Sequence, residues 1–115
     1  MRPEELAEKI TVVKAPAIVD VRTVFEFRAG HISGAIHAQI WKILLRLAPL
    51  PEDRGAEMVV LCELGPRATI AKVLLNAFGY RNVSLLAGHM VGWRRSGLPQ
   101  VKQKRDEGWG FRRKS

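Results

Sequence analysis

The residues best suited to chemistry are the single cysteine, Cys62, and an arginine five positions later, Arg67. Cys62 follows the apolar run 58–61, which predicts a buried strand, and a helix is expected to begin shortly after it. Backbone N–H groups and the positive helix end would then surround the sulfur, and Arg67 adds a cation. These features favour a nucleophilic thiolate with an anion bound beside it. The alternative is an inert cysteine acting as a small apolar residue.

The elements needed to position this loop are visible as short alternating segments. We expect helices over 3–10, 26–29, 41–47 and 68–78, and strands over 17–21, 34–38, 58–61 and 83–86. Alternation of this kind predicts an α/β domain with a mainly parallel central sheet flanked by helices. Asp20 and Cys62 both fall at carboxyl ends of strands, where α/β sheets bind ligands, so the two should share one rim.

Two of the expected helices have apolar residues at helical spacing, which predicts the faces that they bury. For the helix over 41–47 the expected buried face is Trp41, Leu44, Leu45 and Ala48. For the helix over 68–78 it is Ile70, Val73, Leu74, Ala77 and Phe78.

Composition favours one cytoplasmic domain. The chain has 115 residues, of which 47% are hydrophobic and 26% charged, ordinary values for a globular protein with one core. One cysteine excludes an internal disulfide and a Cys-rich metal site. Neither a signal-peptide pattern nor an apolar run long enough for a membrane span is present. His37 and His89 lack companions at metal-ligand spacing, so neither a metal nor another cofactor is expected.

The net charge of +8 is concentrated near the C-terminus. From Arg94 onward there are eight basic and two acidic residues, a balance of +6. We therefore divide the chain into a domain over 1–100 and a basic tail over 101–115. The simplest interpretation of the tail is a solvated terminus, and nucleic acid is not an expected partner because no nucleic-acid motif accompanies it. Trp109 and Phe111 within the tail argue for some contact.

Several separated motifs resemble, in order and spacing, a single-domain rhodanese. The resemblance runs from about Ile18 to Trp93. The motifs are Asp20-Val21-Arg22, Glu26-Phe27, Gly30-His31-Ile32, Gly34-Ala35-Ile36, the loop from Cys62 through Gly65 to Arg67, and Gly88 with Gly92-Trp93.

This resemblance implies a rhodanese-like fold and a sulfurtransferase activity. The family's loop cysteine, here Cys62, takes a sulfane sulfur from a small anionic donor such as thiosulfate and becomes a persulfide. The persulfide passes its outer sulfur to cyanide or to a thiol, either a small thiol or a thioredoxin-like protein. Arg67 would hold the donor and the departing sulfite. The remaining loop positions would contact the substrate, namely Glu63, Leu64, Gly65, Pro66 and Ala68.

Some positions depart from the family pattern. Glu63 is an acid beside the nucleophile and should repel thiosulfate, while Pro66 removes one N–H donor from the loop. His89 stands where a second glycine commonly follows Gly88. Two other functions stay open: a noncatalytic rhodanese-like module that binds through its basic tail, and a small Cys-dependent phosphatase or arsenate reductase. The second is disfavoured because only four residues separate Cys62 from Arg67, a small ring for a tetrahedral phosphate.

Other residues around the motifs have expected supporting roles. Arg22 and Glu26 are spaced to form an ion pair. Asp20 is a candidate for tuning the site through a hydrogen bond to the loop or to Arg67. His31 is expected to be structural, and Trp93 is expected to fill the core near the loop.

Overall fold

The computed structural model describes residues 1–12 and 15–102 of the chain. A four-stranded sheet lies at its centre in the order β2-β1-β3-β4. Its strands are β1 (Ala17–Asp20), β2 (Ile36–His37), β3 (Met58–Leu61) and β4 (Val83–Leu85), and each pairing is parallel. The structure thus confirms the α/β class and the parallel sheet.

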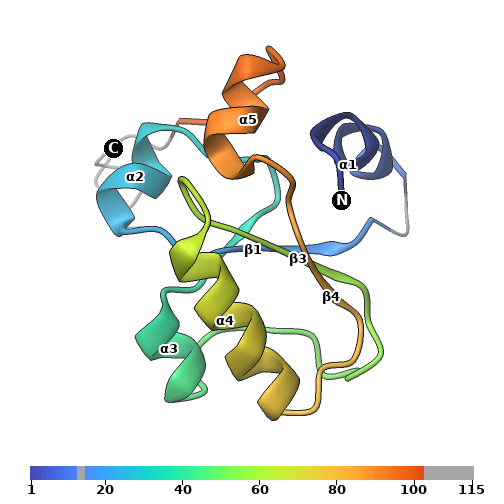
Figure 1. Cartoon of the computed structure of the whole chain (residues 1–115), viewed down its shortest axis with the longest axis vertical. Helices are drawn as coiled ribbons and strands as arrows, with labels where there is room; N and C mark the ends of the chain where they lie inside the picture. The colour runs from blue at the N-terminus through green and yellow to red at the C-terminus, as the bar shows by residue number, and fades with distance from the viewer. Residues whose placement is uncertain (13–14, 103–115) are drawn as a thin grey trace, which may run out of the picture.

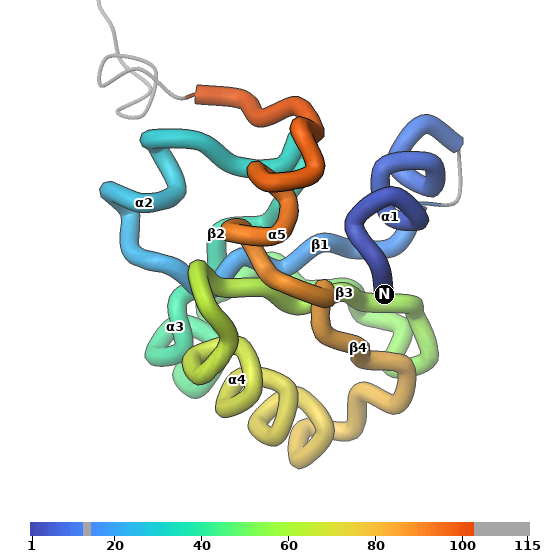
Figure 2. The backbone as a smooth tube through the Cα atoms, turned by 45° about the horizontal axis from the view of Figure 1, so that its top comes forward, coloured from blue at the N-terminus to red at the C-terminus, as the bar shows by residue number. Residues whose placement is uncertain are grey.

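Helices lie on both faces of this sheet (Figures 1 and 2). α3 (Ile40–Leu44) and α4 (Pro66–Ala77) cover one face, while α1 (Pro3–Lys9) and α5 (His89–Arg95) cover the other. α2 (Val24–Ala29) follows β1 and begins with a Thr23 capping box, in which Thr23 and Glu26 bond each other's backbone N–H.

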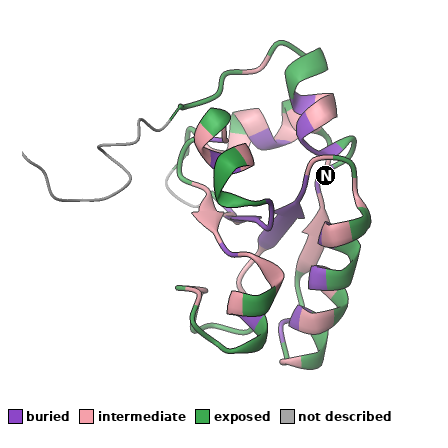
Figure 3. Ribbon diagram, turned by 90° about the vertical axis from the view of Figure 1, so that its left-hand side faces the viewer, coloured by how far each residue is buried: buried purple, intermediate pink, exposed green. Residues whose placement is uncertain are grey.

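The sheet separates two apolar clusters, and Figure 3 shows its buried strands between the outer helices. Met58, Val60 and Cys62 belong to the cluster on the α3–α4 side. Val59 and Leu61 belong to the other, together with the fully buried Trp93 of α5. Side chains of a strand alternate between faces, so β3 directs the Cys62 side chain toward α4. Trp93 fills the core as expected.

The expected faces of the two helices on the Cys62 side are only partly right: Leu74, Phe78 and Ala48 pack against the core while half-buried, but the fully buried positions are different ones. α4 buries its small residues Ala68 and Ala71 together with Leu75, whereas Ile70 and Val73 are 57% and 65% exposed. α3 buries Ile43 and exposes Trp41, Leu44 and Leu45. Small side chains let a helix approach the sheet closely. Ala68 and Ala71 therefore fill the space between α4 and the sheet that larger side chains would fill in a more distant helix.

The described chain runs slightly beyond the expected domain boundary. Val101 forms an antiparallel bridge with His31, in which each residue donates its N–H to the other's carbonyl. Residues 103–115, with Trp109 and Phe111, lie outside the described residues. In the part of the chain that is described, no helix has the length and apolar character needed to cross a membrane.

Candidate active site

Cys62 lies directly after β3, at the rim where β1 also ends. Asp20 and Leu61 are register partners across these two parallel strands, which places Asp20 beside the start of the loop. The strand arrangement therefore confirms that Asp20 and Cys62 share a rim. The Cys62 side chain has no solvent exposure, and the Gly65 backbone N–H donates to its Sγ at 2.9 Å. The sulfur thus lies beneath the loop that carries it.

The loop over 62–67, called the Cys62 loop below, turns sharply at Gly65. Gly65 has φ +141°, a conformation that favours glycine, and it directly precedes α4. Pro66 occupies the first turn of α4, where a missing N–H costs little. Leu64 is 74% exposed at the loop tip, while Ala68 is buried against the sheet. Of the expected substrate-contacting residues, Leu64 is thus outward-facing and Ala68 belongs to the core.

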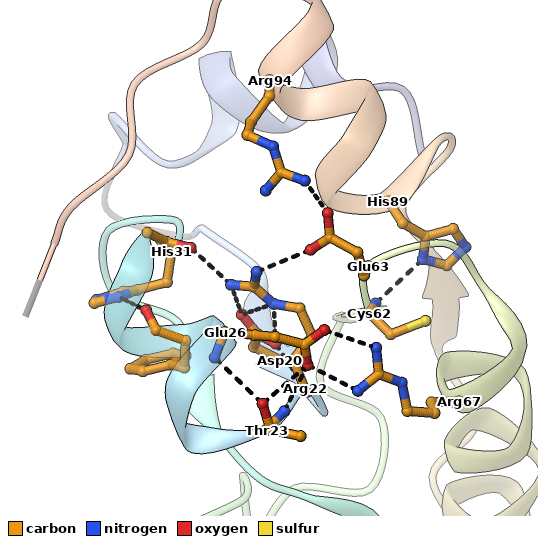
Figure 4. A network of polar contacts seen from close by, with 12 residues as sticks. Asp20, Arg22, Thr23, Glu26, His31, Cys62, Glu63, Arg67, His89 and Arg94 are labelled. Carbon is orange, nitrogen blue, oxygen red and sulfur yellow. Dashed lines mark hydrogen bonds and ion pairs between the residues drawn. The ribbon is translucent and has the colours of Figure 1, made fainter.

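Arg67 is held at the rim by a carboxylate of α2. Its Nη1 and Nη2 donate to the two oxygens of Glu26 at 2.8 and 3.1 Å (Figure 4). The Arg67 hydrogen bonds are the main cause that lowers the pKa of Glu26 to about 2, and the Thr23 backbone N–H adds to it. Glu26 in turn raises the pKa of Arg67, with smaller contributions from the charges of Cys62 and Asp20. Arg67 is therefore a permanently charged and oriented cation.

The expected pair between Arg22 and Glu26 is wrong, because each finds another partner. Arg22 is almost fully buried and donates to both carboxylate oxygens of Asp20, with the shortest contact at 2.8 Å. It also donates to the Gly30 carbonyl and, at 3.2 Å, to Glu63. Asp20 therefore bonds neither to the Cys62 loop nor to Arg67 in the contacts described, and it reaches the loop only through Arg22.

The Glu63 side chain forms ion pairs with two arginines. Its carboxylate lies between Arg22 and Arg94, with an ion pair to each (Figure 4). These two guanidinium groups offset the negative charge that sequence analysis placed beside the nucleophile. Glu63, Arg22 and Arg94 also line a shallow hollow together with Glu26 and Gln100.

His89 also belongs to the site, although the sequence alone did not predict that it contacts Cys62. Its Nδ1 accepts a hydrogen bond from the Cys62 backbone N–H at 3.3 Å. Burial lowers the pKa of His89, which favours the neutral ring needed to accept this bond. The only signal in the sequence was the histidine following Gly88 where a second glycine was expected.

The other histidines lie in structural settings. His31 bonds the Phe27 carbonyl through Nδ1 at 2.8 Å and stacks on the Phe27 ring. His37 bonds the Arg22 carbonyl at 2.7 Å. No group of three or more metal-ligating side chains occurs among residues 1–12 and 15–102.

The rim thus combines the buried Cys62 thiol, the Gly65 N–H that donates to its sulfur, and the Arg67 guanidinium, which Glu26 holds in place. Attack by a thiolate on an electrophilic sulfur or phosphorus needs such an arrangement, because the donors stabilise charge on the nucleophile and the leaving group. The ring of residues 62–67 is small, which suits a single transferred atom.

Comparison with known proteins agrees with this geometry. The rhodanese-like domain family matches residues 2–96. A sulfurtransferase of Allochromatium vinosum is 33% identical over 98 residues, which cover 85% of this chain and 90% of that protein. The thiosulfate sulfurtransferase PspE of Escherichia coli is 27% identical over 97 residues, covering 84% and 89%.

Solved structures give the same result. A rhodanese-related protein from Thermoplasma volcanium superimposes with a TM-score of 0.73 at 26% identity, covering 88% of this chain and 95% of that one. In several other relatives the matching segment is half of the protein or less. The chain belongs to the rhodanese-like domain family of sulfurtransferases.

Proposed function

We propose that this protein transfers sulfane sulfur through a persulfide on Cys62. The observation that carries the proposal is the Cys62 Sγ, buried at the end of β3, bonded by the Gly65 N–H and facing a rim whose cation is oriented by Glu26. A rhodanese-type reaction uses each of these groups, and it requires neither a metal nor a second cysteine.

With thiosulfate as donor, the Cys62 thiolate attacks the outer sulfur of the anion. The new bond joins Sγ to that sulfur, the sulfur–sulfur bond of thiosulfate breaks, and sulfite leaves with the bonding electron pair. Arg67 stabilises the incoming dianion and the departing sulfite. The Gly65 N–H stabilises negative charge on Sγ. The thiosulfate sulfurtransferase name of the Escherichia coli relative supports this donor.

In the second half-reaction a nucleophile attacks the outer sulfur of the persulfide, and Sγ departs as the thiolate. Cyanide would yield thiocyanate, and a thiolate would yield a new persulfide. Cys62 is the single cysteine of the chain, so the acceptor must come from another molecule. A small thiol or a thioredoxin-like protein in the reducing cytoplasm is the acceptor class that we propose.

The charge balance around Glu63 supports an anionic donor. From sequence, this carboxylate was expected to repel thiosulfate. Arg22 and Arg94 both pair with it, so the repulsion is largely offset before a donor arrives. Across the rim, the guanidinium groups of Arg22, Arg67 and Arg94 balance the carboxylates of Asp20, Glu26 and Glu63, so no net negative charge of these side chains opposes an anionic donor.

The proposal is tested by the intact mass of the wild-type protein and Cys62→Ser after thiosulfate, and again after cyanide. We expect the wild type alone to gain one sulfur atom and to lose it with cyanide. A wild type that gains no sulfur from thiosulfate or from an alternative persulfide donor would contradict the proposal. Phosphate release that depends on Cys62 would instead indicate phosphatase chemistry.

A further inference from the structure

His89 has a backbone conformation that is uncommon in residues other than glycine. Its φ is +53°, in the left-handed region, and it follows Gly88, whose φ is +75°. A side chain in this region costs about 1–2 kcal/mol. Such outliers persist where surrounding contacts hold them, and they concentrate at functional sites. His89 is also nearly buried, with 8% exposure, so its ring is fixed among its neighbours.

The ring contacts the Cys62 loop at two points. Nδ1 accepts from the Cys62 N–H at 3.3 Å (Figure 4). On the other side, Nε2 lies 3.2 Å from the place that a Cβ on Gly65 would occupy. Cys62 carries the sulfur, and Gly65 supplies the N–H that bonds it. One side chain therefore packs against both the nucleophile and its donor.

Backbone contacts of α5 extend the same attachment. The Met90 N–H donates to the Cys62 carbonyl at 3.1 Å, and the Val91 N–H donates to the Glu63 carbonyl at 3.3 Å. These bonds fix the carbonyl groups at the base of the loop. The His89 ring adds a third hydrogen bond between α5 and the loop, in which Nδ1 accepts from the Cys62 N–H. The same ring lies next to Gly65.

We propose that His89 is a positioning residue for the Cys62 loop, whose ring holds the Cys62 sulfur and the Gly65 N–H in the relative geometry needed for sulfur transfer. The role rests on the proposed sulfurtransferase function. His89 acts through the loop and takes no part in bond making, and the neutral ring with its proton on Nε2 is the active form.

Two substitutions separate positioning from simple filling of space. His89→Asn places an amide oxygen on Cγ, where His carries Nδ1, and asparagine tolerates the left-handed region. His89→Gly removes the acceptor and relieves the backbone cost, so its thermal stability should be close to that of the wild type. The glycine variant therefore tests the acceptor on a folded protein, and the asparagine variant tests its rescue.

We expect persulfide formation at saturating thiosulfate to slow by about tenfold in His89→Gly and to recover to within about twofold of the wild type in His89→Asn. The KM for thiosulfate should stay unchanged, because Arg67 and Glu26 remain paired. Amide hydrogen exchange measured by NMR should be faster at Cys62 in His89→Gly than in the other two proteins.

Equal persulfide rates in the wild type and His89→Gly would overturn the role, and so would loss of folding in His89→Gly, which would make the ring a core element. Failure of the wild type to form a persulfide would contradict the sulfurtransferase function. In that case amide exchange at Cys62 still decides whether His89 holds the loop.

Discussion

Asp20 and Arg22 form an ion pair with almost no solvent exposure, and it joins the end of β1 to the Cys62 loop through Glu63. Removing one partner of such a pair leaves the other charge buried without compensation. We expect Asp20→Asn to lower the free energy of unfolding by about 3 kcal/mol or more, measured by urea denaturation.

The matched control for that substitution is Glu57→Gln in the partly exposed pair with Lys9, whose N–O distance is 3.3 Å. Its cost should be about 1 kcal/mol or less, because water reaches both side chains and screens the pair. Similar costs for the two variants would show that burial of the Arg22 pair has been overestimated.

Glu26 makes stability depend on pH in a defined direction. Its pKa falls from 4.5 to about 2 in the folded protein, because Arg67 bonds the charged carboxylate. The folded state therefore binds the proton less tightly than the unfolded state. The stabilisation is fully present above about pH 4.5 and is lost as the pH falls toward 2.

Glu26→Gln isolates this charge, because glutamine also completes a capping box with Thr23. Urea denaturation at pH 7 and pH 3 should show a smaller acid-induced loss of stability in Glu26→Gln than in the wild type. An equal loss in both proteins would assign the acid sensitivity to other carboxylates.

At the residue level, the sequence was informative about the nucleophile and less so about its partners. The spacing of Cys62 and Arg67 depends on one strand, one loop and one helix start, all of which are local. Asp20, the buried carboxylate partner of Arg22, lies only two residues away, so that pair is local. The other partners depend on how β1 and α2 lie against the Cys62 loop: Glu63 and Glu26 lie 41 residues from Arg22 and Arg67, respectively, and chain proximity does not indicate these pairs.

At the element scale, α4 is the helix that carries Arg67, and its buried face can be tested directly. Ala71 is fully buried against the sheet, while Val73 is 65% exposed. We expect Ala71→Leu to lower the free energy of unfolding by about 1–3 kcal/mol through overpacking. Val73→Ala should change it by only about 0.5 kcal/mol, since the side chain lies largely in solvent.

The reversed result, with Val73→Ala the more damaging, would restore the face predicted from sequence. That prediction failed at Ile70 and Val73, although Leu74 and Phe78 do pack against the core. The pattern of large apolar residues hid the small ones, Ala68 and Ala71, that a helix packed closely on a sheet buries. The strands were easier to predict, since short runs of β-branched residues such as Ile18, Val19, Val59 and Val60 suit a sheet covered on both faces.

On the scale of the whole molecule, residues 98–102 complete the domain after α5. The Trp93 indole N–H donates to the Pro99 carbonyl at 2.9 Å, and Val101 pairs with His31. Truncation after Gly97 removes both contacts and leaves a buried indole without its acceptor. We expect it to lower the free energy of unfolding by about 1–3 kcal/mol more than truncation after Lys102.

Thermal denaturation of the two truncated proteins checks this difference. Truncation after Lys102 is therefore also the better test of any role of the basic C-terminal segment, because it keeps the contacts of Pro99 and Val101. Equal melting temperatures would mean that the Trp93 N–H finds another acceptor.

The bridge between Val101 and His31 holds the end of the described chain against the residue that follows Gly30. Gln100, one residue earlier, lines the hollow shared with Glu63 and Arg94. The same short segment therefore contacts both the buried Trp93 indole, through Pro99, and the edge of the candidate site. Loosening of residues 98–102 should accordingly disturb the wall of the hollow together with the core, so a loss of stability there and a change at the site are expected to appear as one event.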